Sequence, residues 1–287
     1  MNGEARSSSI LLDRPTDMQL VVCGPVEIYA TAVAAGSPVG RRIHLYSAES
    51  GTALFGSEPD GYGLLAVAAP GAVLESWPDI GGRWRQYLEQ KGRLPAAAVL
   101  YLIEGWAIAL FEAAAHSAPP RQFAEISAGA ELSLPDGHVI RPAAEVLWLE
   151  LIAGEAVIGD SDFRLTPGDG RFPVTSKTWL TVKGESRLRS YTENAISEWL
   201  ESEKTVAAAK SLKALGRLAG RIAAVRIASR NAAEDRQKVE RRKRKQRIEQ
   251  LAGQSLARFD EDRTSLEGFV RESPLLAVCR LVAEHQG

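Results

Sequence analysis

The chain has 287 residues, of which 45% are hydrophobic and 25% charged, and its formal net charge at pH 7 is -1. This composition excludes an intrinsically disordered chain, and the length allows two domains. The net charge hides an asymmetry. Residues 204–250 hold fifteen Lys/Arg and four Asp/Glu, a local balance of +11, so the rest of the chain carries -12.

The two cysteines, Cys23 and Cys279, lie near opposite ends of the sequence without CxxC spacing. We expect reduced thiols in a cytoplasmic protein, because structural disulfides persist in oxidising compartments. The first residues, MNGEARSSSILLDRP, lack a basic stretch followed by an apolar core. We therefore expect no export signal at this end of the chain.

Residues 10–75 consist of short apolar runs separated by turn formers. The runs are MQLVVCG, VEIYATAV, RRIHLYSA, TALFG and GLLAVAA, each of strand length and rich in Val, Ile, Leu and aromatic residues. Strands at such even spacing favour an antiparallel roll or barrel over βαβ units. We predict a first β-roll over residues 1–79.

The pattern becomes helical between residues 80 and 118. Its second half, AAAVLYLIEGWAIALFEAAA at residues 96–115, has almost the length of a membrane span. Glu104 lies near its centre, and a central acid costs about 2.5–3.5 kcal/mol on insertion. The sequence therefore favours a buried helix and keeps a membrane-associated helix as the alternative.

A second all-β stretch covers residues 119–192, with runs such as EVLWLELIAGEAVIGD and KTWLTV. Strands followed by a helix thus occur twice, at a spacing of about 110–120 residues. The predicted fold class is α+β, with two tandem double-stranded β-rolls of the cyclic-nucleotide-binding or jelly-roll type, each followed by helices. Trp148 and Trp179 lie in near-continuous apolar runs, so we predict structural roles for both.

Residues 193–287 contain no strand pattern and are predicted to form a long helical arm. Residues 194–251 read as one helical segment that Gly216 and Gly220 could break or kink. A final helix is predicted to start at Ser273 and Pro274, a typical N-cap and first-turn pair. Apolar residues at helical spacing form a stripe early in the arm, comprising Leu212, Leu215, Leu218, Ile222 and Val225.

The stripe gives way to a basic segment that we treat as a candidate partner-binding site. Only Glu240 opposes its charges. A solvated helix face, an anionic membrane surface and an acidic partner all fit this pattern. The absence of interleaved aromatic residues disfavours nucleic acid. The basic residues are Arg236, Lys238, Arg241, Arg242, Lys243, Arg244, Lys245 and Arg247.

Nothing in the sequence indicates an enzyme. GxxxxGK[ST], GxGxxG after a strand, GxSxG and HExxH motifs are all missing, and we expect no cofactor and no metal. Asp160, Asp162 and Asp169 could act as a general acid–base pair, but they also read as turn formers, which need no catalytic role. The four histidines have no ligand spacing; they are His44, His116, His138 and His285.

Two short stretches imitate parts of the phosphate cassette found in cyclic-nucleotide domains. Residues 55–58, Phe-Gly-Ser-Glu, resemble its first half, but the next arginine is Arg83. In the second roll, residues 168–171 end in Arg171, and Phe172 continues directly into a strand. Without an arginine to pair with the phosphate, we predict that neither roll binds a cyclic nucleotide.

The order of these motifs resembles the N-terminal region of one exporter family, the ATP-binding-cassette bacteriocin exporters whose precursors carry nitrile-hydratase-like leader peptides. The resemblance covers nearly the whole chain but depends on dispersed positions. These are Gly24, Gly40, Arg42, Leu45, Gly51, Phe55, Gly56, Arg141, Pro142, Trp148, Gly154, Pro173, Trp179, Pro274, Leu275, Cys279 and Val282.

The resemblance implies a cytoplasmic, non-catalytic accessory region of a peptide exporter, peripheral to the inner membrane. Such exporters continue into a membrane domain and an ATPase, neither of which lies within these residues. The implied partners are a transporter subunit or the leader peptide, and oligomerisation stays open. A sensor for a small anionic ligand, such as a cyclic nucleotide, is the alternative.

Overall fold

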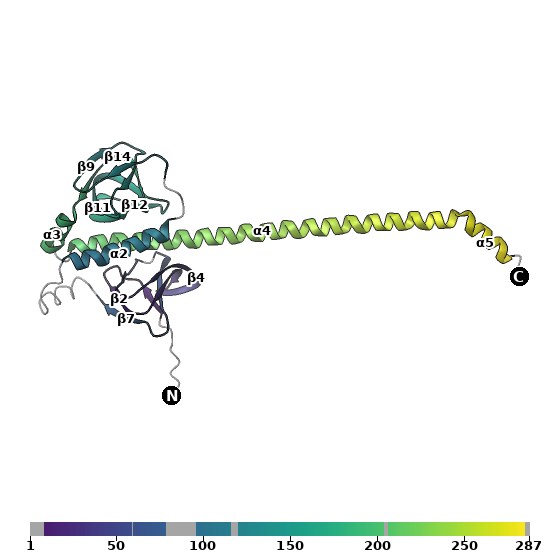
Figure 1. Cartoon of the computed structure of the whole chain (residues 1–287), viewed down its shortest axis with the longest axis horizontal. Helices are drawn as coiled ribbons and strands as arrows, with labels where there is room; N and C mark the ends of the chain where they lie inside the picture. The colour runs from purple at the N-terminus through teal and green to yellow at the C-terminus, as the bar shows by residue number, and fades with distance from the viewer. Residues whose placement is uncertain (1–8, 59, 79–95, 116–119, 204–205, 285–287) are drawn as a thin grey trace, which may run out of the picture. The chain divides into compact units, whose positions relative to one another are not determined.

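The computed structural model describes residues 9–58, 60–78, 96–115, 120–203 and 206–284. It shows a mixed α+β protein whose strands pair mainly antiparallel (Figure 1). The chain divides into two compact units, residues 1–229 and residues 230–287. The first unit contains all of the described strands, and the second consists of helix in its described part.

The strands of residues 9–77 form two sheets, which we call the N-terminal β region. A four-stranded sheet has the order β1-β6-β3-β4, and a three-stranded sheet has the order β5-β2-β7. Inward residues alternate along β3, where Val26, Ile28 and Ala30 are fully buried, as a half-buried strand requires. The strands are β1 Ser9–Leu12, β2 Met18–Cys23, β3 Val26–Ala34, β4 Ser37–Ala48, β5 Ala53–Phe55, β6 Tyr62–Ala68 and β7 Val73–Trp77.

The strands of residues 124–191 form a seven-stranded sheet, which we call the second β region. Its main path is β12-β11-β14-β10-β8; β13 also pairs with β11, and β9 with β14. The β8–β10 pair is parallel and the others are antiparallel. The strands are β8 Ala124–Ile126, β9 Glu131–Leu134, β10 Val139–Pro142, β11 Val146–Ile158, β12 Phe163–Leu165, β13 Arg171–Thr175 and β14 Leu180–Tyr191.

Helix α2 (Ala96–Ala114) is the apolar helix that the sequence predicts. Among the described helices it alone is long and apolar enough to cross a membrane, but it contributes the buried Ile103, Trp106 and Phe111 to the protein core. Its central acid, Glu104, accepts a 2.7 Å hydrogen bond from the Trp148 indole on β11. These contacts are those of the buried helix that the sequence favoured.

The C-terminal helices are α3 (Glu193–Glu203), α4 (Val206–Glu272) and α5 (Pro274–Glu284). Two expectations for this region were wrong. Helix α4 passes through Gly216 and Gly220 without a break, and it ends at Glu272 rather than near residue 251. The start of α5 at Pro274 confirms the predicted N-terminus of the last helix.

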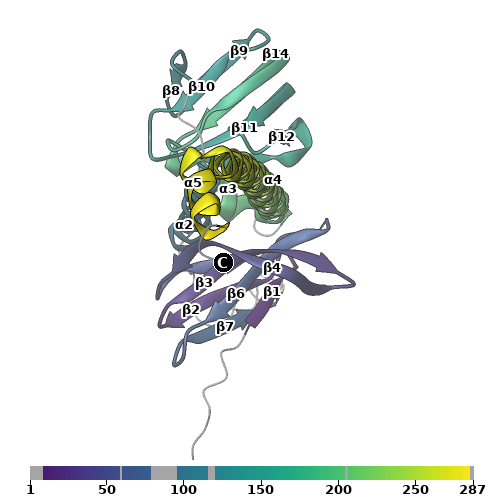
Figure 2. The ribbon, with the colours of Figure 1, turned by 90° about the vertical axis from the view of Figure 1, so that its right-hand side faces the viewer.

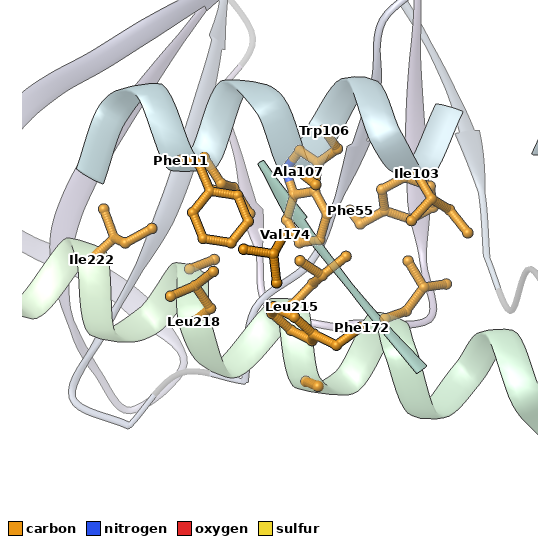
Figure 3. Close-up of a cluster of buried hydrophobic side chains, with 14 of the residues drawn as sticks. Phe55, Ile103, Trp106, Ala107, Phe111, Phe172, Val174, Leu215, Leu218 and Ile222 are labelled. Atoms are coloured by element: carbon orange, nitrogen blue, oxygen red, sulfur yellow. The ribbon is translucent and has the colours of Figure 1, made fainter. Parts of the chain in front are cut away.

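The core of the first unit lies where α2 and the start of α4 run between the two β regions (Figure 2). Figure 3 shows Phe111 of α2 and Leu218 of α4 in this core, with Phe55 from β5 and Phe172 from β13. The apolar stripe of the arm faces inward here, because Leu212, Leu215, Leu218 and Ile222 are buried. Trp148 and Trp179 are 3% and 8% exposed, which confirms their predicted burial.

Candidate functional site

The loop at residues 55–58, the imitation of a cassette in the N-terminal β region, uses its polar groups within the protein. The backbone nitrogen and the hydroxyl of Ser57 both donate to the carbonyl of Leu12, at 2.8 and 3.1 Å, and Ser57 is fully buried. Gly56 lies so close to the backbone of Arg14 that an added Cβ would come within 1.9 Å of its carbonyl oxygen. The two Ser57 donors, which could otherwise bind an anion, therefore have a partner already.

Helix α4 packs against the 55–58 loop. A Cβ on Gly216 would come within 2.9 Å of the Gly56 carbonyl, and one on Gly220 within 3.4 Å of the Glu58 carbonyl. The two glycines therefore permit a close approach of helix and loop. The GRLAG spacing, with small residues four apart on one helix face, was the sequence signal for this contact.

In the second β region, an ion pair joins the corresponding loop to α4. It contains the short 3₁₀ helix η1 (Pro167–Asp169). Asp169, only 5% exposed, accepts hydrogen bonds from the backbone nitrogen and hydroxyl of Thr166, at 2.7 and 2.9 Å. Arg217 of α4 forms a salt bridge with the same carboxylate. The Arg217 guanidinium, which could otherwise pair with an anion, is thus engaged by the Asp169 carboxylate.

Arg171, the nearest candidate for a phosphate-binding arginine, is held by aromatic residues. Its guanidinium carbon lies 4.1 Å from the ring centre of Tyr191 and 4.7 Å from that of Trp199. One of its nitrogens donates to the carbonyl of Ala195 at 3.4 Å. β13 begins at Arg171, as expected from the residues that follow it. The arrangement is a structural cation–π stack.

The remaining aspartates of the turns form no acid–base pair with Asp169. Asp162 adopts a left-handed backbone with φ 54°, as in a tight turn, and Asp160 lines a hollow beside the end of α2. That hollow has a volume of about 10 Å³, room for roughly one water molecule. Small-molecule pockets in proteins usually measure about 300–1,000 Å³.

The histidines within the described residues are not arranged as metal ligands. His44 Nε2 lies 2.6 Å from the Glu27 carboxylate, and Ser47 donates to the same oxygen at 2.7 Å. The Ser47 hydrogen bond lowers the pKa of Glu27, burial opposes this shift, and the hydrogen bond and charge of His44 lower the pKa further. Serine and histidine both bond to the acid rather than to each other, so the group is no nucleophile–base pair. His116 and His285 lie outside the described residues.

Among the described residues, no three His, Cys, Asp or Glu side chains are grouped as metal ligands. His138 lies in the turn before β10. Both cysteines are free and exposed.

The basic segment of α4 is exposed along its whole length, from Arg236 to Arg247. Lys238 pairs with Asp235 at 3.1 Å, and Lys245 pairs with Glu249 at 3.7 Å. Within the described part of the chain, the other six cations have no carboxylate partner. Because successive residues turn by about 100°, five consecutive cations from Arg241 surround the helix. They form a collar of charge instead of a single solvated face.

Comparisons with known proteins leave the family of this chain unassigned. No protein-family model matches the sequence, and no curated protein matches it. A cAMP-bound PfPKA-R structure is 14% identical, with 69% of this chain and 72% of that chain covered and a TM-score of 0.23.

Two further solved structures are equally distant. The regulatory subunit of a cAMP-independent protein kinase A from Trypanosoma brucei is 15% identical, covers 70% of this chain and 75% of its own, and has a TM-score of 0.20. YhaK from Escherichia coli is 12% identical, with 64% and 78% covered and a TM-score of 0.18. TM-scores this low do not establish a shared fold.

Proposed function

We propose that this protein is a non-catalytic interaction module: a folded platform of two β regions that carries a helical arm with a docking surface. The observation that supports this proposal most is a contrast within α4. Near its start, α4 packs against both candidate ligand loops, through Gly216 at the 55–58 loop and through Arg217 at Asp169. The basic segment, in contrast, exposes six cations that have no carboxylate partner among the described residues. The charged groups that are free to bind a partner therefore lie on the arm rather than in the two loops.

The order of sequence motifs supports a finer proposal, in which the module serves bacteriocin-type peptide export from the cytoplasmic side. The two β regions would be double-stranded rolls within residues 1–79 and 119–192, with connecting helices at 80–118 and the arm at 193–287. The arm would dock a transporter subunit or the leader peptide, close to the inner membrane. Membership of the exporter family is a hypothesis drawn from dispersed positions.

The chemistry of the basic segment specifies the kind of surface that it would meet. Such a collar of charge would mainly raise the rate at which an acidic partner associates with the arm. An anionic membrane would contribute about 1 kcal/mol per cation held near its surface. Both attractions weaken with salt because exposed charges are screened. The sequence between Arg236 and Arg247 contains no aromatic residue that could stack on bases.

A binding experiment at two ionic strengths tests this proposal. The wild-type chain should bind the transporter partner from the native host, or vesicles with anionic lipid, at low salt and release them at high salt. The variant Arg242→Glu, Lys243→Glu, Arg244→Glu should lose this binding. A control with the same change of charge on the platform, Arg121→Glu, Lys183→Glu, Arg187→Glu, should keep it, because these exposed cations lie outside the arm.

Two results would contradict the proposal. Equal binding by the arm variant and the platform control would show that the basic segment is only solvated. Calorimetric binding of cAMP or cGMP with a Kd of about 10 μM or tighter, near -7 kcal/mol, would support the sensor alternative instead. We expect no such binding, because Arg171 and the donors of Ser57 are engaged within the protein.

A further inference from the structure

The eight cations of the basic segment, residues 236–247, occupy two opposite sides of α4. Successive residues of an α-helix turn by about 100°, so the cations fall into two sets of four, each within an arc of about 100°, with the centres of the two arcs roughly opposite each other. The first basic face consists of Lys238, Arg241, Arg242 and Lys245. The second basic face consists of Arg236, Lys243, Arg244 and Arg247.

Neither basic face is neutralised by its own helix. The ion pairs of Lys238 with Asp235, at 3.1 Å, and of Lys245 with Glu249, at 3.7 Å, both belong to the first basic face and join exposed side chains. Exposed pairs contribute little stability, so an outside carboxylate can replace them. On the second basic face, Glu240 is the one acid among four cations, and within the described residues it has no ion-pair partner. Like charges three and four residues apart weaken a helix, so both faces gain from an outside anion.

Apolar side chains are missing from both basic faces. Val239, 48% exposed, is the one large apolar residue between Arg236 and Arg247, and it lies between the two faces. Helices that lie on a bilayer bury an apolar face at its surface, and electrostatic attraction adds to that attachment. The basic segment would therefore attach to a membrane by charge alone.

A flat bilayer would also reach only one basic face. A helix with its side chains is about 10–12 Å across, whereas charge interactions are screened over about 8 Å at physiological ionic strength. The cations of the far face would thus gain little from the bilayer. A partner that lines both sides of the helix would pair with the cations of both faces.

We propose that the partner of the basic segment is an acidic protein that holds α4 in a cleft, with carboxylates against both basic faces. The inference rests on the proposed docking role of the arm and names the chemistry of its partner. Five of the eight cations are arginines, whose forked donors match the two oxygens of a carboxylate. Two faces engaged at once bind more tightly than either face alone.

Neutralisation of one face at a time tests the proposal. Glutamine replaces each cation because its helix propensity is close to that of lysine and arginine, and circular dichroism checks that both variants stay helical. The first-face variant is Lys238→Gln, Arg241→Gln, Arg242→Gln, Lys245→Gln. The second-face variant is Arg236→Gln, Lys243→Gln, Arg244→Gln, Arg247→Gln. A platform control removes the same charge at exposed cations outside the arm, with Arg121→Gln, Lys177→Gln, Lys183→Gln, Arg187→Gln.

The probes are poly-L-glutamate, as an acidic polypeptide, and vesicles of phosphatidylglycerol and phosphatidylcholine, both at an ionic strength of about 0.15 M. The wild type and the platform control should bind poly-L-glutamate more tightly than the vesicles at equal concentrations of anionic groups. Each face variant should raise the Kd for poly-L-glutamate by about tenfold or more, which corresponds to about 1.4 kcal/mol. The loss should be this large because each variant removes one of two jointly engaged faces.

Two results would overturn the proposal. Vesicles bound more tightly than poly-L-glutamate would identify an anionic membrane as the surface that the basic segment meets. A Kd for poly-L-glutamate that rises by about twofold or less in each face variant would show that either face binds on its own, without a partner on both sides.

The same set of proteins separates this inference from the proposed function. If only the inference fails, the wild type still binds the vesicles or the transporter partner, and the variant Arg242→Glu, Lys243→Glu, Arg244→Glu loses that binding. If the docking role itself fails, the wild type binds poly-L-glutamate, the vesicles and the transporter partner no better than this variant does. The two failures are therefore distinguishable.

Discussion

The hydrogen bond between Trp148 and Glu104 joins helix α2 to the second β region, and its removal gives a quantitative prediction. Trp148→Phe keeps an aromatic ring beside Trp199, whose centre lies 6.2 Å away, but removes the indole N–H that donates to Glu104 at 2.7 Å. A hydrogen bond to a charged group contributes about 1.5–3 kcal/mol. Since Glu104 is only partly buried, we expect a loss of about 1–2 kcal/mol, or about 2–8 °C in Tm.

The loss should depend on pH. Burial raises the pKa of Glu104 above its ordinary value, the Trp148 hydrogen bond opposes this rise, and the charge of Glu193 adds to it. A carboxyl whose folded pKa is raised contributes its stability below the unfolded pKa and loses it as pH rises through the folded pKa. Trp148→Phe raises the folded pKa further. The variant should therefore lose more stability relative to wild type at pH 7 than at about pH 4.

Denaturant unfolding at the two pH values measures both effects. Trp179→Phe is a matched control, because Trp179 is also buried but has no carboxylate partner within the described structure. In a Glu104→Gln background, the pH dependence of the Trp148→Phe loss should disappear. Equal losses for Trp148→Phe and Trp179→Phe at pH 7, without any dependence on pH, would refute the proposed role of the hydrogen bond.

Two further predictions concern the contacts of α4. Gly216→Ala should destabilise the fold by about 1–3 kcal/mol in thermal unfolding, because its Cβ would meet the 55–58 loop at 2.9 Å. The control Gly268→Ala places its Cβ where no atom lies within 4 Å, so it should stabilise the helix by up to about 1 kcal/mol. A neutral Gly216→Ala would contradict the close approach. Asp169→Ala should cost about 1–3 kcal/mol in denaturant unfolding, because it leaves the Thr166 donors without their acceptor. Arg217→Ala should cost less, since its side chain is 46% exposed and the acid keeps its threonine donors; the reverse order would refute this account.

Local patterns in the sequence were sufficient to predict the type of most elements. Alternating and continuous apolar runs identified strands such as β3 and β11, and the Ser273–Pro274 pair identified the start of α5. Burial of Trp148 followed from its apolar neighbours. The sequence could also have predicted the end of α4, because no proline interrupts the chain between Val206 and Pro274. The expected end near residue 251 was wrong, because helix-forming residues continue beyond it to Glu272.

The tertiary structure alone decided how distant segments meet. Gly216 resembles a helix breaker in sequence, and only the proximity of the 55–58 loop shows that its missing side chain permits packing. The pairing of Asp169 with Arg217, 48 residues apart, likewise depends on α4 lying against the second β region. Hydrophobic periodicity is a property of neighbouring residues and can be read along the chain. Contacts between remote residues arise only once the chain has closed its loops around a common core.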